Sequence, residues 1–133
     1  MNDSPGDWLP LRFRDLDAYG HVYHAEFLTL LDEARSRWVA SRGLPGPADF
    51  VLARLEIDWV SPLTPEDTAV RAEFVVEAVG TKSLTLDETM VAADGRVVAR
   101  SRSVTVRWDR PTGSPLALSD EERRALLPQE GGR

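Results

Sequence analysis

One long stretch of the chain predicts a helix that other elements must surround. Residues 23–42 contain neither proline nor glycine, and Gly43 and Pro45 then end the helical pattern. Apolar residues recur at helical spacing along one face and widen it: Phe27, Leu31, Ala34 and Trp38, with Leu28, Leu30 and Val39 beside them. Much of the helix circumference is therefore expected to be buried, which restricts the folds open to the chain.

Alternation of apolar and polar residues predicts strands over most of the remaining chain. The runs cover residues 8–14, 50–60, 68–79, 84–92 and 97–108. In the second run one face carries apolar side chains that are expected to point inward: Val51, Ala53, Leu55, Ile57 and Trp59. Short turns separate the later strands, including an Asp94-Gly95 pair suited to a hairpin. Consecutive strands joined by tight turns indicate an antiparallel sheet.

These elements predict an α+β fold in which about five antiparallel strands curl around one long central helix. Ser119 and Glu122 have the spacing of a capping box, which predicts a short helix near the C-terminus. With 133 residues and no internal repeat, the chain is expected to form a single domain over residues 1–133. Residues 1–7 and 129–133 are expected to be flexible.

Composition narrows the classes of function. The formal net charge of −6 and a pI near 4.9 argue against general nucleic-acid binding. Because the chain has no cysteine, it has no disulfide, thiolate metal site or cysteine nucleophile. The first residues, MNDSPGDWLP, lack an apolar signal core, and no stretch reaches membrane-spanning length. The sequence therefore predicts a cytoplasmic protein that neither binds nucleic acid nor spans a membrane.

A cluster of titratable residues lies at the start of the predicted helix. Asp15, Asp17, His21 and His24 stand close together, and the two histidines are the only ones in the chain. A helix N-terminus offers unpaired N–H groups and a partial positive charge, which would stabilise a developing oxyanion. A neighbouring carboxylate could activate water or attack a carbonyl directly. Gly20 would let a substrate approach the backbone closely. This pattern favours hydrolysis of an ester or thioester without serine, cysteine or metal.

The same residues have plainer interpretations. An aspartate before a helix is most often a cap, so Asp15 or Asp17 could have no further role. His24 could be a polar surface residue, or a core histidine with one ring nitrogen bonded. His21 and His24 could bind a metal, but a separation of three at the edge of a helix is a weak ligand pattern. The residues alone leave catalysis and capping open.

The segment from Asp15 to Phe27, DLDAYGHVYHAEF, closely resembles the motif that leads into the central helix of hotdog-fold acyl-CoA thioesterases. The nearest branch contains 4-hydroxybenzoyl-CoA thioesterase and the small bacterial acyl-CoA thioesterases. The resemblance continues at Glu33-Ala34-Arg35, expected at the end of the helix, and at residues 51–62 and 80–83. It implies a hotdog fold and hydrolysis of acyl-CoA to a free acid and coenzyme A, with no cofactor and no metal.

The resemblance also implies roles for individual residues. Asp17 matches the catalytic carboxylate, acting as general base or nucleophile, and Asp15 matches a structural aspartate. His24 matches a second catalytic residue, whose backbone N–H would polarise the thioester carbonyl. Lys82 and Ser83 match a turn that contacts the nucleotide end of coenzyme A. Three further residues are expected to form the oxyanion site and position the substrate: Gly20, Val22 and Tyr23.

The resemblance implies a homodimer or homotetramer with the active site at the subunit junction. A sheet around one helix leaves strand edges uncovered, so self-association is also expected on physical grounds. Residues 51–59 and 84–92 are the strands predicted to face a partner. Two other functions stay open: a thioesterase for acyl groups on a carrier protein, and a non-catalytic module that binds acyl-CoA or lipid. An apolar pocket for the acyl group is expected from Phe27, Leu30, Leu31, Trp59 and Met90.

Overall fold

The computed structural model of the chain describes residues 8–12, 15–44 and 49–127. The flexibility expected at 1–7 and 129–133 concerns positions outside the described residues. The elements, in chain order, are β1 (Trp8–Pro10), α1 (His24–Ser41), β2 (Phe50–Trp59), β3 (Ala69–Val79), β4 (Ser83–Ala92), β5 (Val97–Asp109), β6 (Ser114–Pro115) and α2 (Asp120–Leu126). Neither helix in this part of the chain is long and apolar enough to cross a membrane.

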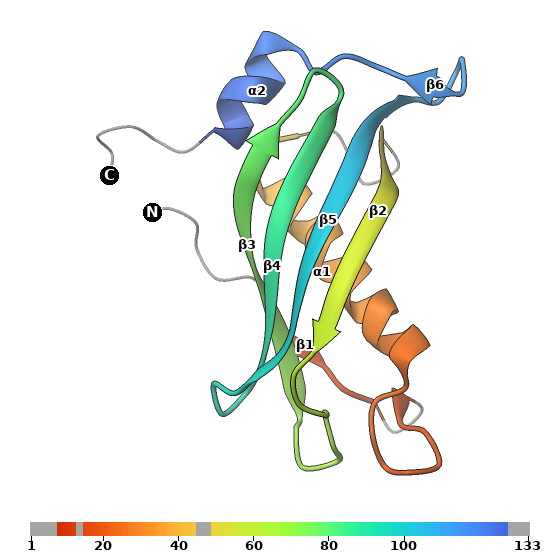
Figure 1. Cartoon of the computed structure of the whole chain (residues 1–133), viewed down its shortest axis with the longest axis vertical. Helices are drawn as coiled ribbons and strands as arrows, with labels where there is room; N and C mark the ends of the chain where they lie inside the picture. Colours follow the sequence, from red (N-terminus) through yellow and green to blue (C-terminus); the bar gives the residue numbers. More distant parts are fainter. Residues whose placement is uncertain (1–7, 13–14, 45–48, 128–133) are drawn as a thin grey trace.

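The strands form one antiparallel sheet that bends around α1 (Figure 1). Their order is β1-β3-β4-β5-β2, and the two-residue β6 pairs with β5. Short turns join β3 to β4 and β4 to β5, whereas β2 lies on the far side of β5 from them. The predicted α+β architecture, with about five antiparallel strands around one long helix and a short C-terminal helix, is confirmed.

The core lies between α1 and the face of the sheet that curls around it. Phe27, Leu31 and Trp38 of α1 are buried, and the Trp38 ring packs 5.7 Å from the ring of Phe74 on β3. Burying one such side chain contributes about 1.5–3 kcal/mol, so this helix–sheet contact is a main source of stability. The helix ends as predicted before Gly43, whose φ of +74° is a conformation that favours glycine.

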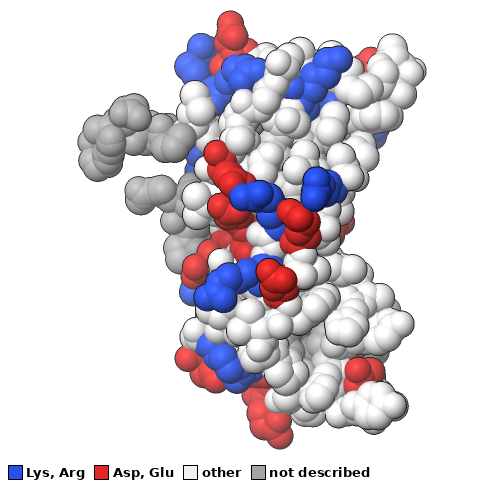
Figure 2. Space-filling model, viewed as in Figure 1, with Lys and Arg blue, Asp and Glu red and all other residues white. Residues whose placement is uncertain are grey.

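The outer face of the sheet carries charges of both signs. Acidic and basic side chains alternate across the middle of this face (Figure 2). Arg102 on β5 pairs with Glu77 on β3 and lies 3.8 Å from Asp87 on β4, and Arg71 pairs with Glu73 at 3.0 Å. Such exposed pairs contribute little stability, but they leave no surface of a single sign across the middle of the sheet.

A β-bulge in β2 changes which side chains point toward the core. The pairing of β2 with β5 shifts between Leu52 and Arg54, so the alternation predicted for residues 50–60 does not continue through the strand. Leu55 and Ile57 are half-buried against the core, as predicted. Val51 and Ala53, which lie before and at the bulge, are exposed. Trp59, at the end of this edge strand, is also partly exposed, although its ring packs against Phe27.

Of the two strands predicted to face a partner, only β2 lies at an end of the sheet. β2 is an end strand and, within the described chain, it pairs with β5 alone over ten residues. β4 instead hydrogen-bonds to β3 on one side and to β5 on the other. Both edges of β4 are therefore paired within the described chain, so residues 84–92 offer a partner no free strand edge.

A buried ion pair joins the middle of α1 to the sheet. Arg35 donates from Nε and Nη2 to the Glu88 carboxylate at 2.6 and 3.0 Å. The hydroxyls of Ser101 and Ser103 donate to the same carboxylate, each at 2.7 Å. Buried charges persist only when they are paired and hydrogen-bonded, and this carboxylate meets both conditions. Neither the inward position of Glu88 nor this pair was predicted, and Arg35 lies within α1 rather than at its end.

Candidate active site

A tight loop leads from β1 into α1 and contains most of the predicted site residues. The Asp17 N–H donates to the His21 carbonyl at 2.7 Å, and the Gly20 N–H donates back to the Asp17 carbonyl at 3.1 Å. Leu16 and Val22 form an isolated antiparallel bridge that closes the loop. Gly20 has a φ of +80°, which a residue with a Cβ adopts only at a cost. The loop is therefore built by its own backbone and requires glycine at its tip.

Asp15 holds the base of this loop. Its side chain is completely buried and accepts hydrogen bonds from the Arg12 backbone N–H at 2.8 Å and from Arg12 Nη2 at 3.0 Å. The hydrogen bond to Asp15 is the main reason that the pKa of Arg12 is raised. The Asp15 carbonyl accepts from the Tyr23 N–H at 2.9 Å, which fixes the residue before α1. These contacts make Asp15 a structural residue of the loop.

Asp17 uses one carboxylate oxygen to shape the loop. Its Oδ1 accepts from the backbone N–H of Tyr19 at 2.8 Å and of His21 at 3.1 Å. No residue in the described part of the chain donates a hydrogen bond to its Oδ2. The His21 N–H is the largest influence that lowers the pKa of Asp17, and Tyr19 and the two histidines act in the same direction. Asp17 is therefore half-buried, ionised at neutral pH and anchored by a single oxygen.

The helix start beside this carboxylate has no side-chain cap. Tyr23 is the N-cap residue, with extended φ and ψ of −65° and 142°, and its side chain makes no capping hydrogen bond. The first bond of the helix runs from the Phe27 N–H to the Tyr23 carbonyl at 2.9 Å. The N–H groups of His24, Ala25 and Glu26 precede that bond, and they have no acceptor among the described residues. These amides can therefore stabilise negative charge that develops beside the helix.

The imidazole of His24 contacts the end of β2. Its ring centre lies 4.6 Å from that of Trp59, and Trp59 packs edge-on against Phe27 at 4.7 Å. The aromatic contact holds the His24 ring at the helix start, although the side chain stays exposed. Trp59 was predicted as an apolar pocket residue, but its contact with His24 was not. No local pattern could have revealed it, because the two residues meet only when β2 passes the start of α1.

The predicted coenzyme A turn does not lie near Asp17 within one chain. Ser83 pairs with Val106 on β5, and Val106 pairs with Val51 near the start of β2, whereas Trp59 is at the other end of β2. Along β5, Val106 lies seven residues from Ala99, the partner of Trp59, which corresponds to roughly 23 Å because each residue advances about 3.3 Å. The turn at residues 80–83 and the loop at residues 15–23 accordingly occupy opposite ends of the molecule (Figure 1).

An open groove of about 670 Å³ runs between α1 and the edge strand β2. Its lining is mainly apolar, with Asp32 and Arg35 on the α1 side, and includes Leu28, Leu31, Val51 and Leu52. Of the five residues predicted to line an acyl pocket, only Leu31 lines this groove, and Phe27, Leu30 and Met90 are packed in the core. Among the described residues, no group of three or more His, Asp or Glu side chains could hold a metal ion.

An antiparallel sheet curled around one long helix is the arrangement of the hotdog fold. A family model described as the thioesterase-like superfamily matches residues 11–130. The chain therefore belongs to the thioesterase-like superfamily and is an enzyme of the thioesterase class, as the motif at residues 15–27 implied.

Individual relatives agree with this assignment. The chain is 25% identical over 127 residues to the long-chain acyl-CoA thioesterase FadM of Escherichia coli K12, covering 89% of this chain and 93% of the relative. A thioesterase from Thermus thermophilus, solved in complex with coenzyme A and Zn, is 30% identical, with a TM-score of 0.81 over 92% of this chain and 90% of that one. A predicted thioesterase from Bacillus stearothermophilus is 25% identical, with a TM-score of 0.78 over 90% and 91%.

Proposed function

We propose that this protein hydrolyses acyl-CoA to a free acid and coenzyme A, with Asp17 as the catalytic carboxylate. The observation that carries the proposal is the Asp17 side chain, ionised and anchored by one oxygen in the loop that enters an uncapped helix start. The acyl-CoA substrate is supported by the relative from Escherichia coli, which acts on long-chain acyl-CoA, and by the Thermus enzyme, which was solved with coenzyme A.

In the proposed reaction, the thioester carbonyl oxygen accepts a hydrogen bond from the His24 N–H. Gly20, Val22 and Tyr23 shape the approach to this amide. Asp17 Oδ2 takes a proton from a water molecule, whose oxygen attacks the carbonyl carbon, and the helix start stabilises the oxyanion. The C–S bond then breaks, and the proton held by Asp17 passes to the departing thiolate. The products are a carboxylic acid and coenzyme A.

The same geometry also permits Asp17 to act as a nucleophile. Its Oδ2 would attack the carbonyl carbon, the thiolate would leave, and water would open the resulting mixed anhydride. After a single turnover in ¹⁸O-labelled water, label in the Asp17 carboxylate would identify the anhydride route. The anhydride route transfers the label to the Asp17 carboxylate when water attacks at that side, whereas the general-base route places it only in the product acid.

A homodimer would complete the coenzyme A site. If β2 pairs antiparallel with its copy across a twofold axis, the start of one β2 lies beside the end of the other. Lys82 of the partner subunit then reaches the same end of the assembly as Trp59 and the Asp17 loop. The separation of roughly 23 Å within one chain is thereby removed. We infer that Lys82 and Ser83 contact the nucleotide from the partner subunit, and that the site lies at the subunit junction.

A non-catalytic acyl-CoA-binding module is the second candidate. It is favoured by one observation, since Asp17 Oδ1 already accepts two loop amides and so acts as a structural cap. The two candidate functions differ in their use of Asp17 Oδ2, because catalysis requires this oxygen and capping does not. Binding without thiol release by the unaltered protein would support the module and contradict the thioesterase. A preference for acyl groups on carrier protein over acyl-CoA would redirect the substrate assignment.

The first test replaces Asp17 with asparagine. Asp17→Asn keeps an oxygen that can accept from Tyr19 and His21, so the loop is expected to persist while the base is lost. Thiol release from short, medium, long and aromatic acyl-CoAs is expected to fall by about 10²–10³-fold. Asp87→Asn, on the outer face of the sheet, is the matched control and should retain the parent rate. Parent-like turnover by Asp17→Asn would contradict the assignment.

A further inference from the structure

The segment that follows β2 touches the candidate site at two points. Trp59, the last residue of β2, packs against the His24 ring at 4.6 Å. Four residues later, the carbonyl of the buried residue Leu63 accepts a hydrogen bond from the Val22 N–H at 3.0 Å. Val22 is two residues before His24 and is itself buried. The placement of residues 59–64 therefore bears directly on the loop that enters α1.

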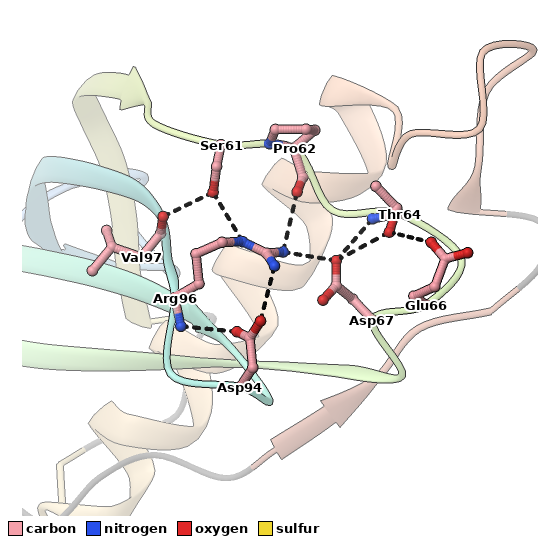
Figure 3. A network of polar contacts seen from close by, with 8 residues as sticks. All are labelled: Ser61, Pro62, Thr64, Glu66, Asp67, Asp94, Arg96 and Val97. Atoms are coloured by element: carbon pink, nitrogen blue, oxygen red, sulfur yellow. Dashed lines mark hydrogen bonds and ion pairs between the residues drawn. The ribbon is translucent and has the colours of Figure 1, made fainter.

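Arg96 forms hydrogen bonds with this segment. It belongs to the turn between β4 and β5, and its guanidinium reaches across to the segment (Figure 3). Nε donates to Ser61 Oγ at 3.2 Å, and Nη2 donates to the Pro62 carbonyl at 3.3 Å and to Asp67 Oδ2 at 2.8 Å. Ser61 Oγ in turn donates to the Val97 carbonyl at 2.9 Å. One side chain thus ties three positions after β2 to a different hairpin.

A single peptide group links the Arg96–Asp67 hydrogen bond to the candidate site. Asp67 Oδ2 accepts from the Thr64 N–H at 2.9 Å as well as from Arg96. The Thr64 N–H and the Leu63 carbonyl belong to the same planar peptide, so they cannot turn independently. A peptide that is held at its N–H by Asp67 therefore presents its carbonyl to Val22 in a fixed direction.

We propose that Arg96 is a positioning residue for thioester cleavage. Acting through Asp67, it fixes the Leu63–Thr64 peptide and so holds Val22 and the start of α1 in their reactive arrangement. The inference rests on the proposed function, because its catalytic consequence requires that the loop carry the reaction. Arg96 itself touches none of the reacting atoms in the proposed mechanism. Misplacing a catalytic group by 1 Å can cost about 10²-fold in rate, so a residue that positions the site only indirectly can still affect the rate of the reaction.

Asp94 provides a matched control within the same network. It lies 3.0 Å from Arg96 Nη1 and is exposed on the hairpin, but no hydrogen bond joins it to residues 59–67 among the described residues. Removing its charge with Asp94→Asn therefore disturbs Arg96 without interrupting the connection to Val22. Arg96→Gln removes that connection, because the shorter amide cannot span Ser61, Pro62 and Asp67 together.

The first measurement does not depend on activity. Amide hydrogen exchange at Val22, followed by NMR in the full-length protein, is expected to be about tenfold faster or more in Arg96→Gln and unchanged in Asp94→Asn. Asp67→Asn should accelerate the same amide, and the Arg96→Gln/Asp67→Asn double variant should add little, since both act through one connection. Unchanged exchange at Val22 in Arg96→Gln would overturn the proposal.

The second measurement is the kinetics of thiol release from an acyl-CoA that the parent protein hydrolyses. Arg96→Gln is expected to lower kcat by about tenfold or more with KM within about twofold, at a temperature where circular dichroism shows full folding. Arg96→Lys, which keeps the charge near Asp67, should retain more of kcat and replaces Arg96→Gln if that variant does not fold. Faster Val22 exchange with an unchanged kcat would overturn the positioning role. A parent protein that hydrolyses no acyl-CoA would instead overturn the proposed function, and the exchange data would still report on the connection.

Discussion

The two oxygens of Asp17 have different surroundings, and this difference decides how the residue can act. Oδ1 accepts from two loop amides, as an ordinary capping aspartate does. The same bonds favour the charged form, so the contacts that make Asp17 structural also keep its carboxylate ionised at neutral pH. Capping and catalysis are therefore compatible in one side chain. The sequence presented them as alternatives because it does not separate the two oxygens.

The lowered pKa of Asp17 predicts a pH dependence. Hydrogen bonding to the His21 N–H favours the ionised carboxylate, so its protonation midpoint should lie below the ordinary value of about 3.9. The stability linked to this group is present above that ordinary value and is lost as the pH falls through the folded-state pKa. Activity that depends on ionised Asp17 should be lost over the same range. NMR titration of the Asp17 carboxylate carbon measures the midpoint, and a value at or above about 3.9 would contradict the prediction.

At the scale of elements, α1 is held to the sheet by two different kinds of contact. Apolar side chains such as Phe27 and Leu31 give most of the buried surface, and they tolerate small shifts along the helix. The Arg35–Glu88 pair, with two serine hydroxyls on the carboxylate, joins the middle of α1 to β4 and β5 through directional hydrogen bonds. Because α1 begins at the candidate site, this pair also sets where the uncapped helix start lies relative to the sheet.

Removing the charge of the buried Glu88 carboxylate should lower the stability of the protein. Glu88→Gln removes the only buried counter-charge that the described residues give Arg35 and leaves it the exposed Asp32 at 3.3 Å, so the free energy of unfolding is expected to fall by about 3–5 kcal/mol. Glu33→Gln is the matched control. Glu33 lies on α1, the helix that carries Arg35, and it pairs with Arg37 while both side chains are about half exposed. That change should cost about 1 kcal/mol or less. Urea unfolding followed by circular dichroism compares the two, and equal losses would show that burial does not decide the outcome.

At the scale of the whole molecule, β2 is the feature that a single chain leaves incomplete. It is a ten-residue strand at the end of the sheet, and apolar side chains on it are exposed, including Val51 at 40% and Leu52 at 42%. The groove between α1 and β2 opens along the same flank. Long uncovered edges with apolar side chains favour pairing with another strand, and a twofold axis would pair β2 with its own copy.

A charged side chain introduced on the edge strand β2 should prevent the protein from self-associating. Leu52→Lys is expected to shift the protein from a dimer or tetramer to a monomer in light scattering, because a lysine on each copy places like charges near the axis. Acyl-CoA turnover should fall with it, since the proposed site uses residues from two subunits. Val75→Lys is the control, as Val75 is an exposed apolar residue on β3, on the other side of the sheet from β2. A parent protein that scatters as a stable monomer would refute the proposed arrangement.

The sequence by itself determined the elements and the kind of site. Helical spacing and the absence of proline and glycine determined α1, and alternation determined the long strands, because both depend on side chains that are near each other along the chain. The motif at residues 15–27 placed the candidate carboxylate, the glycine with positive φ and the helix start together. These are local contacts, and a local pattern is enough to predict them.

Only the tertiary structure decided which contacts these elements make with one another. It buried Glu88 against Arg35, put a bulge in β2 and paired both edges of β4. It also separated the turn at residues 80–83 from the Asp17 loop and linked Arg96 to Val22 through one peptide. Each of these depends on strand order and register between segments far apart in the chain. Register is fixed by the packing of the whole sheet around α1, so no single segment of the sequence contains it.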